Sequence, residues 1–214
     1  MIYFVSDTHF NHNNVVKYER NQFKNIKEHD DFVMSVIKNT VKEGDILYHL
    51  GDFCMGSELP IDIAYEFKNL PCKKILIAGN HDAAGNDGTV VNHFSSIFDE
   101  VYTKPLFYSK RVLLSHEPLP VTQGTLNIHG HLHGAFLNSA NHVNVNIHMI
   151  NYKLMSEKTM INKLGQLTKD SSKFMYEWYA DKYVFTTEKD YVVFDEEGKV
   201  DVIKTREEII KRNI

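Results

Sequence analysis

The sequence predicts an α/β fold with mixed β-sheet, on the basis of two patterns. In the first part of the chain, short apolar runs of strand length alternate with stretches of helical periodicity. From residue 111 onward the apolar runs follow one another with little helix between them, which favours antiparallel or mixed pairing and argues against a purely parallel sheet. The predicted strands are residues 2–5, 45–50, 74–78, 111–115, 125–129 and 143–147.

Helices are predicted between and after these strands. Residues 26–41 place Ile and Val at near-helical spacing, and residues 60–70 begin with a proline, which is favoured in a first helical turn. A further helix is predicted to begin at Ser156 and to stop at Gly165, because glycine commonly follows a helix end. We therefore place the end of the main domain, residues 1–165, at that glycine.

The remaining residues, 166–214, are predicted to form a small C-terminal extension. It should contain a β-hairpin that turns at Gly198 and a short helix whose start is marked by Thr205 and Glu208. The aromatic-rich stretch 174–185 is interpreted as packing this extension onto the main domain. The alternative is a surface that faces a partner or a substrate.

Composition limits the classes of protein that this chain can be. Its 214 residues, 43% of them hydrophobic, suffice for one packed domain with a small appendage. A formal net charge of -4 argues against non-specific nucleic-acid binding, which needs clustered Lys and Arg. Cys54 and Cys72 are too few for a disulfide framework and suit a reducing compartment. With no expected secretion signal or membrane span, we expect a cytoplasmic protein; its oligomeric state is left open.

Five short polar motifs each follow a predicted strand. Because loops at the ends of strands converge in α/β proteins, their side chains should meet. Each motif alone is typical of a turn or of a structural histidine, but five in order favour a metal site. The motifs are Asp7-Thr8-His9, Gly51-Asp52, Gly79-Asn80-His81-Asp82, Ser115-His116 and Gly130-His131-Leu132-His133.

The donor types in these motifs predict two divalent cations. Carboxylate, imidazole and amide donors suit Mn, Fe, Zn or Co better than calcium. The absence of cysteine from the motifs argues against a structural zinc site. Two cations about 3.5–4 Å apart need a bridging carboxylate, for which we choose Asp52. With a bound hydroxide the centre keeps about one positive charge, so it attracts phosphate without a basic patch, and the hydroxide can attack phosphorus in line.

The ordered motifs resemble those of the calcineurin-like metallophosphoesterase superfamily, in particular its small bacterial and phage members. The signature D-x-H, GD, GNH followed by D or E, a lone His and GHxH is complete between residues 7 and 133. The resemblance implies two mixed β-sheets packed as a sandwich with flanking helices, a four-layer αββα fold. It also implies two metal sites: Asp7, His9, Asp52 and His133 for one cation, and Asp52, Asn80, His116 and His131 for the other.

The resemblance leaves His81 free of metal. That histidine would stabilise the transition state or protonate the leaving oxygen, with Asp82 orienting it. Manganese is the first choice for both cations, with Fe, Zn, Co or Ni as alternatives.

Residues close in sequence to the first motif are candidates for substrate binding. His12, Asn13 and Arg20 follow it, and the Arg20 guanidinium could bind a phosphate through two donors, although a solvated charge explains it equally well. His49 and His129 border the motifs inside predicted strands, so we interpret them as core residues or as partners of the ligands.

Three functions follow from these residues. The first is a phosphodiesterase that acts on a nucleotide or another small phosphodiester, and the second is a phosphomonoesterase with the same metal centre. The third is a non-catalytic scaffold of the same fold, against which the retained His81 and complete ligand set weigh. A protein Ser/Thr phosphatase is disfavoured because Phe53 follows Gly51-Asp52 where that branch has a further Asp-Arg.

Overall fold

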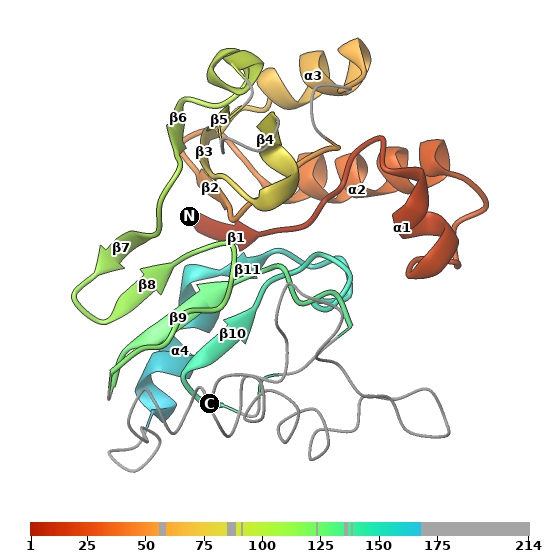
Figure 1. Cartoon of the computed structure of the whole chain (residues 1–214). Coiled ribbons are helices and arrows are strands. Elements are labelled where there is room, and N and C mark those ends of the chain that lie inside the picture. Colours follow the sequence, from red (N-terminus) through yellow and green to blue (C-terminus); the bar gives the residue numbers. More distant parts are fainter. Residues whose placement is uncertain are drawn as a thin grey trace, which may run out of the picture.

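The computed structural model describes residues 1–55, 59–84, 89–90, 92–122, 124–134, 137 and 139–167. It has two main β-sheets, one above the other in Figure 1, with helices beside them. The predicted hairpin, the short capped helix and the aromatic stretch 174–185 all lie outside the described residues. The boundary at residue 165 stays a prediction.

The first sheet has the strand order β11-β1-β2-β3-β6. Strands β1 (Ile2–Val5), β2 (Ile46–His49), β3 (Lys73–Ile77) and β6 (Glu100–Tyr102) are parallel, and β11 (Met155–Ser156) pairs antiparallel with β1. Val5 pairs with His49, and His49 pairs with Leu76. The carboxyl ends of β1, β2 and β3 therefore lie level at one edge.

The second sheet has the order β10-β9-β8-β7. Strands β8 (Val112–Leu114), β9 (Leu126–His129) and β10 (His142–Asn144) are parallel, and β7 (Leu106–Ser109) pairs antiparallel with β8. A two-stranded ribbon joins β4 (Ala83–Ala84) to β5 (Thr89–Val90). Both main sheets are mixed, which confirms the predicted fold class.

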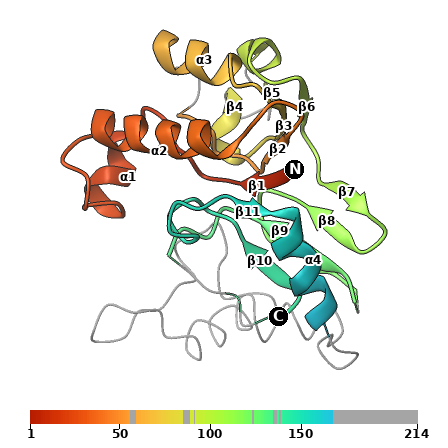
Figure 2. The same ribbon diagram turned by 180° about the vertical axis from the view of Figure 1, so that it is seen from behind.

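Buried apolar side chains fill the space between the sheets and beneath the helices. Phe4 and Ile77 of the first sheet share one cluster with Leu114 and Ile128 of the second. The other cluster joins the first sheet to α2 (Ile26–Thr40) and α3 (Ile61–Lys68), which lie on its far side (Figure 1). Helix α4 (Glu157–Gln166) runs beside the second sheet (Figure 2). The remaining helical elements are α1 (Asn13–Tyr18) and the 3-10 turns η1 (Asn80–Asp82) and η2 (Asn92–Ser96).

The end of α4 corrects one prediction. The helix begins after Ser156, as predicted, and the Ser156 side chain caps it by accepting the N–H of Thr159. The helix nevertheless continues through Gly165 and ends at Gln166, because an exposed glycine in a last turn costs only about 1 kcal/mol relative to alanine. No helix in the described ranges is long and apolar enough to cross a membrane.

Candidate metal centre

The polar motifs lie in the loops that follow the carboxyl ends of strands in both sheets. Those that contain Asp7, Asp52 and Asn80 follow β1, β2 and β3, while those that contain His116 and His131 follow β8 and β9. The Asp7 N–H donates to Gly51 O at 2.9 Å, and the His9 N–H donates to Asp52 O at 3.0 Å, so the first two loops are joined.

The backbone at the site adopts an uncommon conformation. Asp7, His9, Asp52 and His131 have φ values of 55°, 50°, 54° and 67°. Non-glycine residues rarely occupy this left-handed region, and such residues gather where function constrains the chain. The surrounding hydrogen bonds therefore hold these four side chains in fixed directions.

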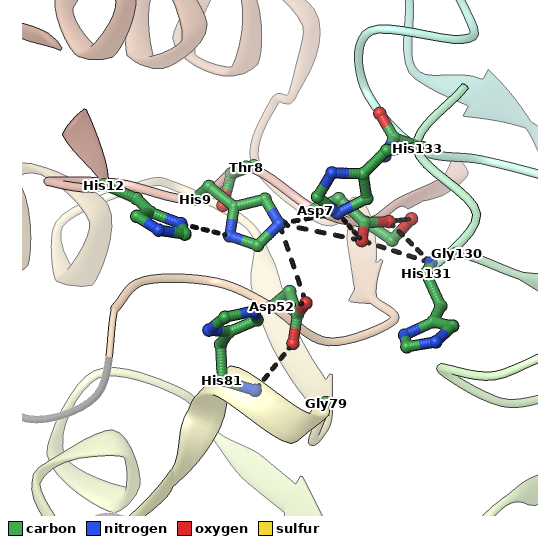
Figure 3. A network of polar contacts seen from close by, with 12 residues as sticks. Asp7, Thr8, His9, His12, Asp52, Gly79, His81, Gly130, His131 and His133 are labelled. Carbon is green, nitrogen blue, oxygen red and sulfur yellow. Dashed lines mark hydrogen bonds and ion pairs between the residues drawn. The ribbon is translucent and has the colours of Figure 1, made fainter. Parts of the chain in front are cut away.

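The first cluster consists of Asp7, His9, Asp52 and His133, whose donor atoms all lie within 4.8 Å of one another. Figure 3 shows these side chains turned toward one centre. His9 Nε2 lies 3.0 Å from His133 Nε2 and 3.6 Å from Asp52 Oδ2. His133 Nε2 lies 3.5 Å from Asp7 Oδ1. All but His133 are buried, so the carboxylates face imidazoles rather than water.

The second cluster consists of Asp52, His116 and His131, with Asn80 beside them. Asn80 Oδ1 lies 3.0 Å from His116 Nε2 and 3.1 Å from His131 Nδ1, and these two nitrogens lie 3.2 Å apart. Ligands about 2.0–2.2 Å from one cation are about 2.8–3.6 Å from each other in octahedral or tetrahedral arrangements. The donor atoms of this cluster therefore fit a divalent cation.

Asp52 belongs to both clusters. Its Oδ2 faces His9 at 3.6 Å, and its Oδ1 faces His116 at 3.4 Å. One carboxylate oxygen is directed to each cluster, as a bridging ligand requires. The structure thus brings all seven predicted ligands together, in the two groups that the resemblance implied.

Charge pairing in the centre shifts several pKa values. Burial alone would raise the pKa of Asp7 and of Asp52, but hydrogen bonds and charges of neighbouring histidines hold both well below the usual range. Burial alone would lower the pKa of His116 and of His133, yet the carboxylates beside them raise each to about 10. A cation that binds these imidazoles must displace a proton, so metal binding should strengthen as pH rises.

His81 lies beside the first cluster without belonging to it. Its N–H donates to Asp52 Oδ1 at 2.9 Å, while its ring lies 5.1 Å from the His9 ring. The side chain is 30% exposed, so it can reach a substrate from the solvent side. Its catalytic role stays a prediction.

Asp82 does not orient His81 as we expected. Its carboxylate is fully buried and accepts the backbone N–H groups of Asp52, Phe53 and Gly79 at 2.8–2.9 Å. These bonds occupy both oxygens and tie the loop after β2 to the loop after β3. Asp82 therefore supports the backbone that carries Asp52.

The position of Arg20 corrects a further expectation. Its side chain is completely buried, and its guanidinium donates to Asp7 O at 2.6 Å and to Thr8 O at 3.2 Å. Arg20 thus stabilises the backbone of the loop that carries Asp7 and His9. Because it is buried there, its guanidinium cannot bind a substrate phosphate through two donors. Of the other substrate candidates, Asn13 is exposed on α1, and His12 Nδ1 lies 3.2 Å from His9 Nδ1.

Other residues contribute to the centre through its surroundings. His49 and His129 are buried, which confirms their interpretation as core residues, and His49 Nε2 lies 3.0 Å from the Thr8 hydroxyl. Glu19, which sequence reasoning missed, contacts His133 Nδ1 at 2.5 Å. No motif could have identified Glu19, because its position depends on α1, which was not predicted.

Comparisons with known proteins agree with this arrangement. The calcineurin-like phosphoesterase family matches residues 1–203. An uncharacterized protein of Methanocaldococcus jannaschii is 30% identical over 167 residues, which cover 72% of this chain and 86% of that protein. Among solved structures, a protein of unknown function from Aquifex aeolicus is 30% identical with a TM-score of 0.60, covering 77% of this chain and 98% of that one.

A second solved structure, an archaeal phosphodiesterase, is 16% identical with a TM-score of 0.37 and covers 68% of this chain and 82% of its own. The chain belongs to the calcineurin-like phosphoesterase family, a family of metal-dependent phosphoric ester hydrolases.

Proposed function

We propose that this protein hydrolyses a small phosphodiester, such as a nucleotide, with two divalent cations as cofactors and manganese as the preferred metal. The observation that carries this proposal is the sharing of Asp52 between two clusters of donor atoms. Asp7, His9 and His133 would complete the first site, and Asn80, His116 and His131 the second. When bound, the two cations polarise the phosphoryl oxygens and supply a water-derived nucleophile at neutral pH.

His81 is proposed to act on the substrate itself. Its backbone is fixed by the bond to Asp52, and its ring lies at the open side of the first cluster. From there an imidazole can donate a proton to the leaving oxygen or stabilise charge on the phosphoryl group. Asp82 and Arg20 contribute indirectly, because both hold the loops that carry the ligands.

Charge and space favour a diester over a monoester. A phosphomonoester carries close to two negative charges at pH 7, whereas a diester carries one. Arg20, the arginine next to the first loop, is buried and gives its donors to backbone carbonyls, so it does not form a direct ion pair with the substrate. A cavity of about 260 Å³ adjoins Asn80 and His116 and is also lined by Lys104 and Leu119. It offers room for a second substituent on the phosphate.

The test compares two chromogenic esters at the manganese-loaded protein. We expect a higher kcat/KM for bis(4-nitrophenyl) phosphate than for 4-nitrophenyl phosphate, and loss of both activities in Asp52→Asn. A strong preference for the monoester would support the phosphomonoesterase alternative. Absence of both activities in a protein that binds the metals would instead favour the scaffold.

A further inference from the structure

The segment from His12 to Arg20 contacts the first cluster at several points. Helix α1 occupies its middle, with His12 just before the helix and Glu19 just after it. We propose that Glu19 is a positioning residue for the first cation site: it fixes the ring of His133 and thereby sets the affinity of that site and not of the other. This inference rests on the proposed metal centre.

The contact between Glu19 and His133 fixes which nitrogen of the imidazole faces the cluster. Glu19 Oε2 lies 2.5 Å from His133 Nδ1, and a carboxylate can only accept there, so Nδ1 carries the proton. Nε2, the atom that lies 3.5 Å from Asp7 Oδ1 and 3.0 Å from His9 Nε2, is then the nitrogen that offers its lone pair once a cation displaces the proton there. A carboxylate in this position also makes the imidazole a stronger donor to a cation.

The same segment also contacts two other ligands of the first cluster, His9 and Asp7. His12 Nδ1 lies 3.2 Å from His9 Nδ1, and Figure 3 shows the two rings side by side. Arg20 donates to the carbonyls of Asp7 and Thr8. The segment therefore contacts the outer side of three first-site residues.

The second cluster takes its support from elsewhere. The nitrogen of His116 that faces away from the cluster, Nδ1, lies 2.8 Å from the carbonyl oxygen of Leu50, the residue that follows β2. This contrast is the reason to expect an effect on one site only.

The position of Glu19 is held by its backbone. The N–H groups of Glu19 and Arg20 both donate to Val15 O, at 3.0 and 2.7 Å, and Val15 is buried against the domain. The carboxylate is thus placed next to His133 before any cation binds, which is the requirement for a partner that orients a ligand. The Glu19 side chain as a whole is 37% exposed to solvent.

The experiment is a manganese titration of the full-length protein after its metals have been removed. We expect two binding events in the wild type. In Glu19→Ala one event should keep its affinity and the other should weaken about 10-fold to 100-fold, the usual effect of losing such a partner. The affinity of Glu19→Gln for this cation should lie between those of the wild type and Glu19→Ala, since its amide oxygen still accepts the N–H of His133 Nδ1 but carries no charge. Glu43→Ala is the matched control, because that exposed glutamate precedes β2 at the opposite edge of the sheet.

The outcomes separate this inference from the proposed function. A wild-type protein that binds no manganese would contradict the metal centre itself. Two unchanged affinities in Glu19→Ala would overturn the role of Glu19, and so would equal weakening of both sites. Thermal unfolding of each metal-free variant checks that the fold is kept, and Glu19→Gln provides a second reading if Glu19→Ala does not fold.

Discussion

The carboxylate of Asp82 accepts the backbone N–H of Asp52 at 2.8 Å, deep inside the domain. The same carboxylate accepts the N–H groups of Phe53 and Gly79. Asp82→Ala would leave these donors buried and unpaired, so we predict a loss of at least about 2 kcal/mol in the free energy of unfolding, together with reduced metal content.

Chemical denaturation and metal analysis measure both effects. Asp31→Ala is the control, because Asp31 is exposed and pairs with Lys27 at the surface, where an ion pair contributes about 0–1 kcal/mol. Equal stabilities for the two variants would show that Asp82 does not hold the loops.

Gly130 lies against the first motif so closely that a side chain cannot be added. A Cβ atom there would collide with the Asp7 carboxylate and the Ser6 hydroxyl. We predict that Gly130→Ala displaces Asp7 and sharply lowers manganese affinity. Gly134→Ala should have little effect, because among the described residues no atom beyond its chain neighbours lies within 4 Å of the corresponding position. Equal manganese affinities for the two variants, measured by titration, would contradict this close packing of Gly130 against Asp7.

Substitution of His81 should separate catalysis from metal binding. Because His81 lies outside both clusters, His81→Asn should keep both cations but lose about 100-fold to 10,000-fold in kcat. His116→Asn should lose metal first. A smaller loss in His81→Asn for esters of good leaving groups would identify His81 as the proton donor, and a uniform loss would indicate charge stabilisation. Near-normal activity on every ester, with both cations bound, would mean that His81 has no catalytic role.

Buried neutral histidines should make the fold sensitive to acid. Burial lowers the pKa of His49 from 6.5 to about 3. Between these values the unfolded chain binds a proton that the folded protein does not, so stability falls as pH decreases through this window. We predict that His49→Gln reduces the slope of stability against pH by up to about 1.4 kcal/mol per pH unit.

Unfolding of the metal-free proteins between pH 6.5 and pH 4 measures this slope. Removing the cations beforehand keeps metal release out of the comparison. His116 and His133, whose pKa values are raised to about 10, lose their contribution only above this window, as pH increases. Parallel curves for wild type and His49→Gln would show that His49 does not contribute.

The convergence of the polar motifs could be predicted from the sequence because it depends on regular structure. Apolar runs identified β1, β2, β3, β8 and β9, and parallel strands end at a common edge. The donor types of these motifs indicate divalent metals without any knowledge of distances.

The supporting residues could not be predicted in the same way. Arg20 looked like a substrate ligand because its charge is visible in the sequence while its burial is not. Glu19 and Asp82 act through contacts that depend on the direction of α1 and on a 3-10 turn after β3. Strands β6, β7 and β11 could not be predicted because they are short edge strands with mixed polarity, whose pairing depends on tertiary contacts.

The number of divalent cations bound by each chain tests the shared role of Asp52 most directly. After manganese loading, mass spectrometry of the intact native protein should show two cations in the wild type. Asp52→Asn should lose both, because Asp52 faces both clusters. A wild-type chain that binds one cation or none would contradict the shared centre, and so would an Asp52→Asn variant that keeps both.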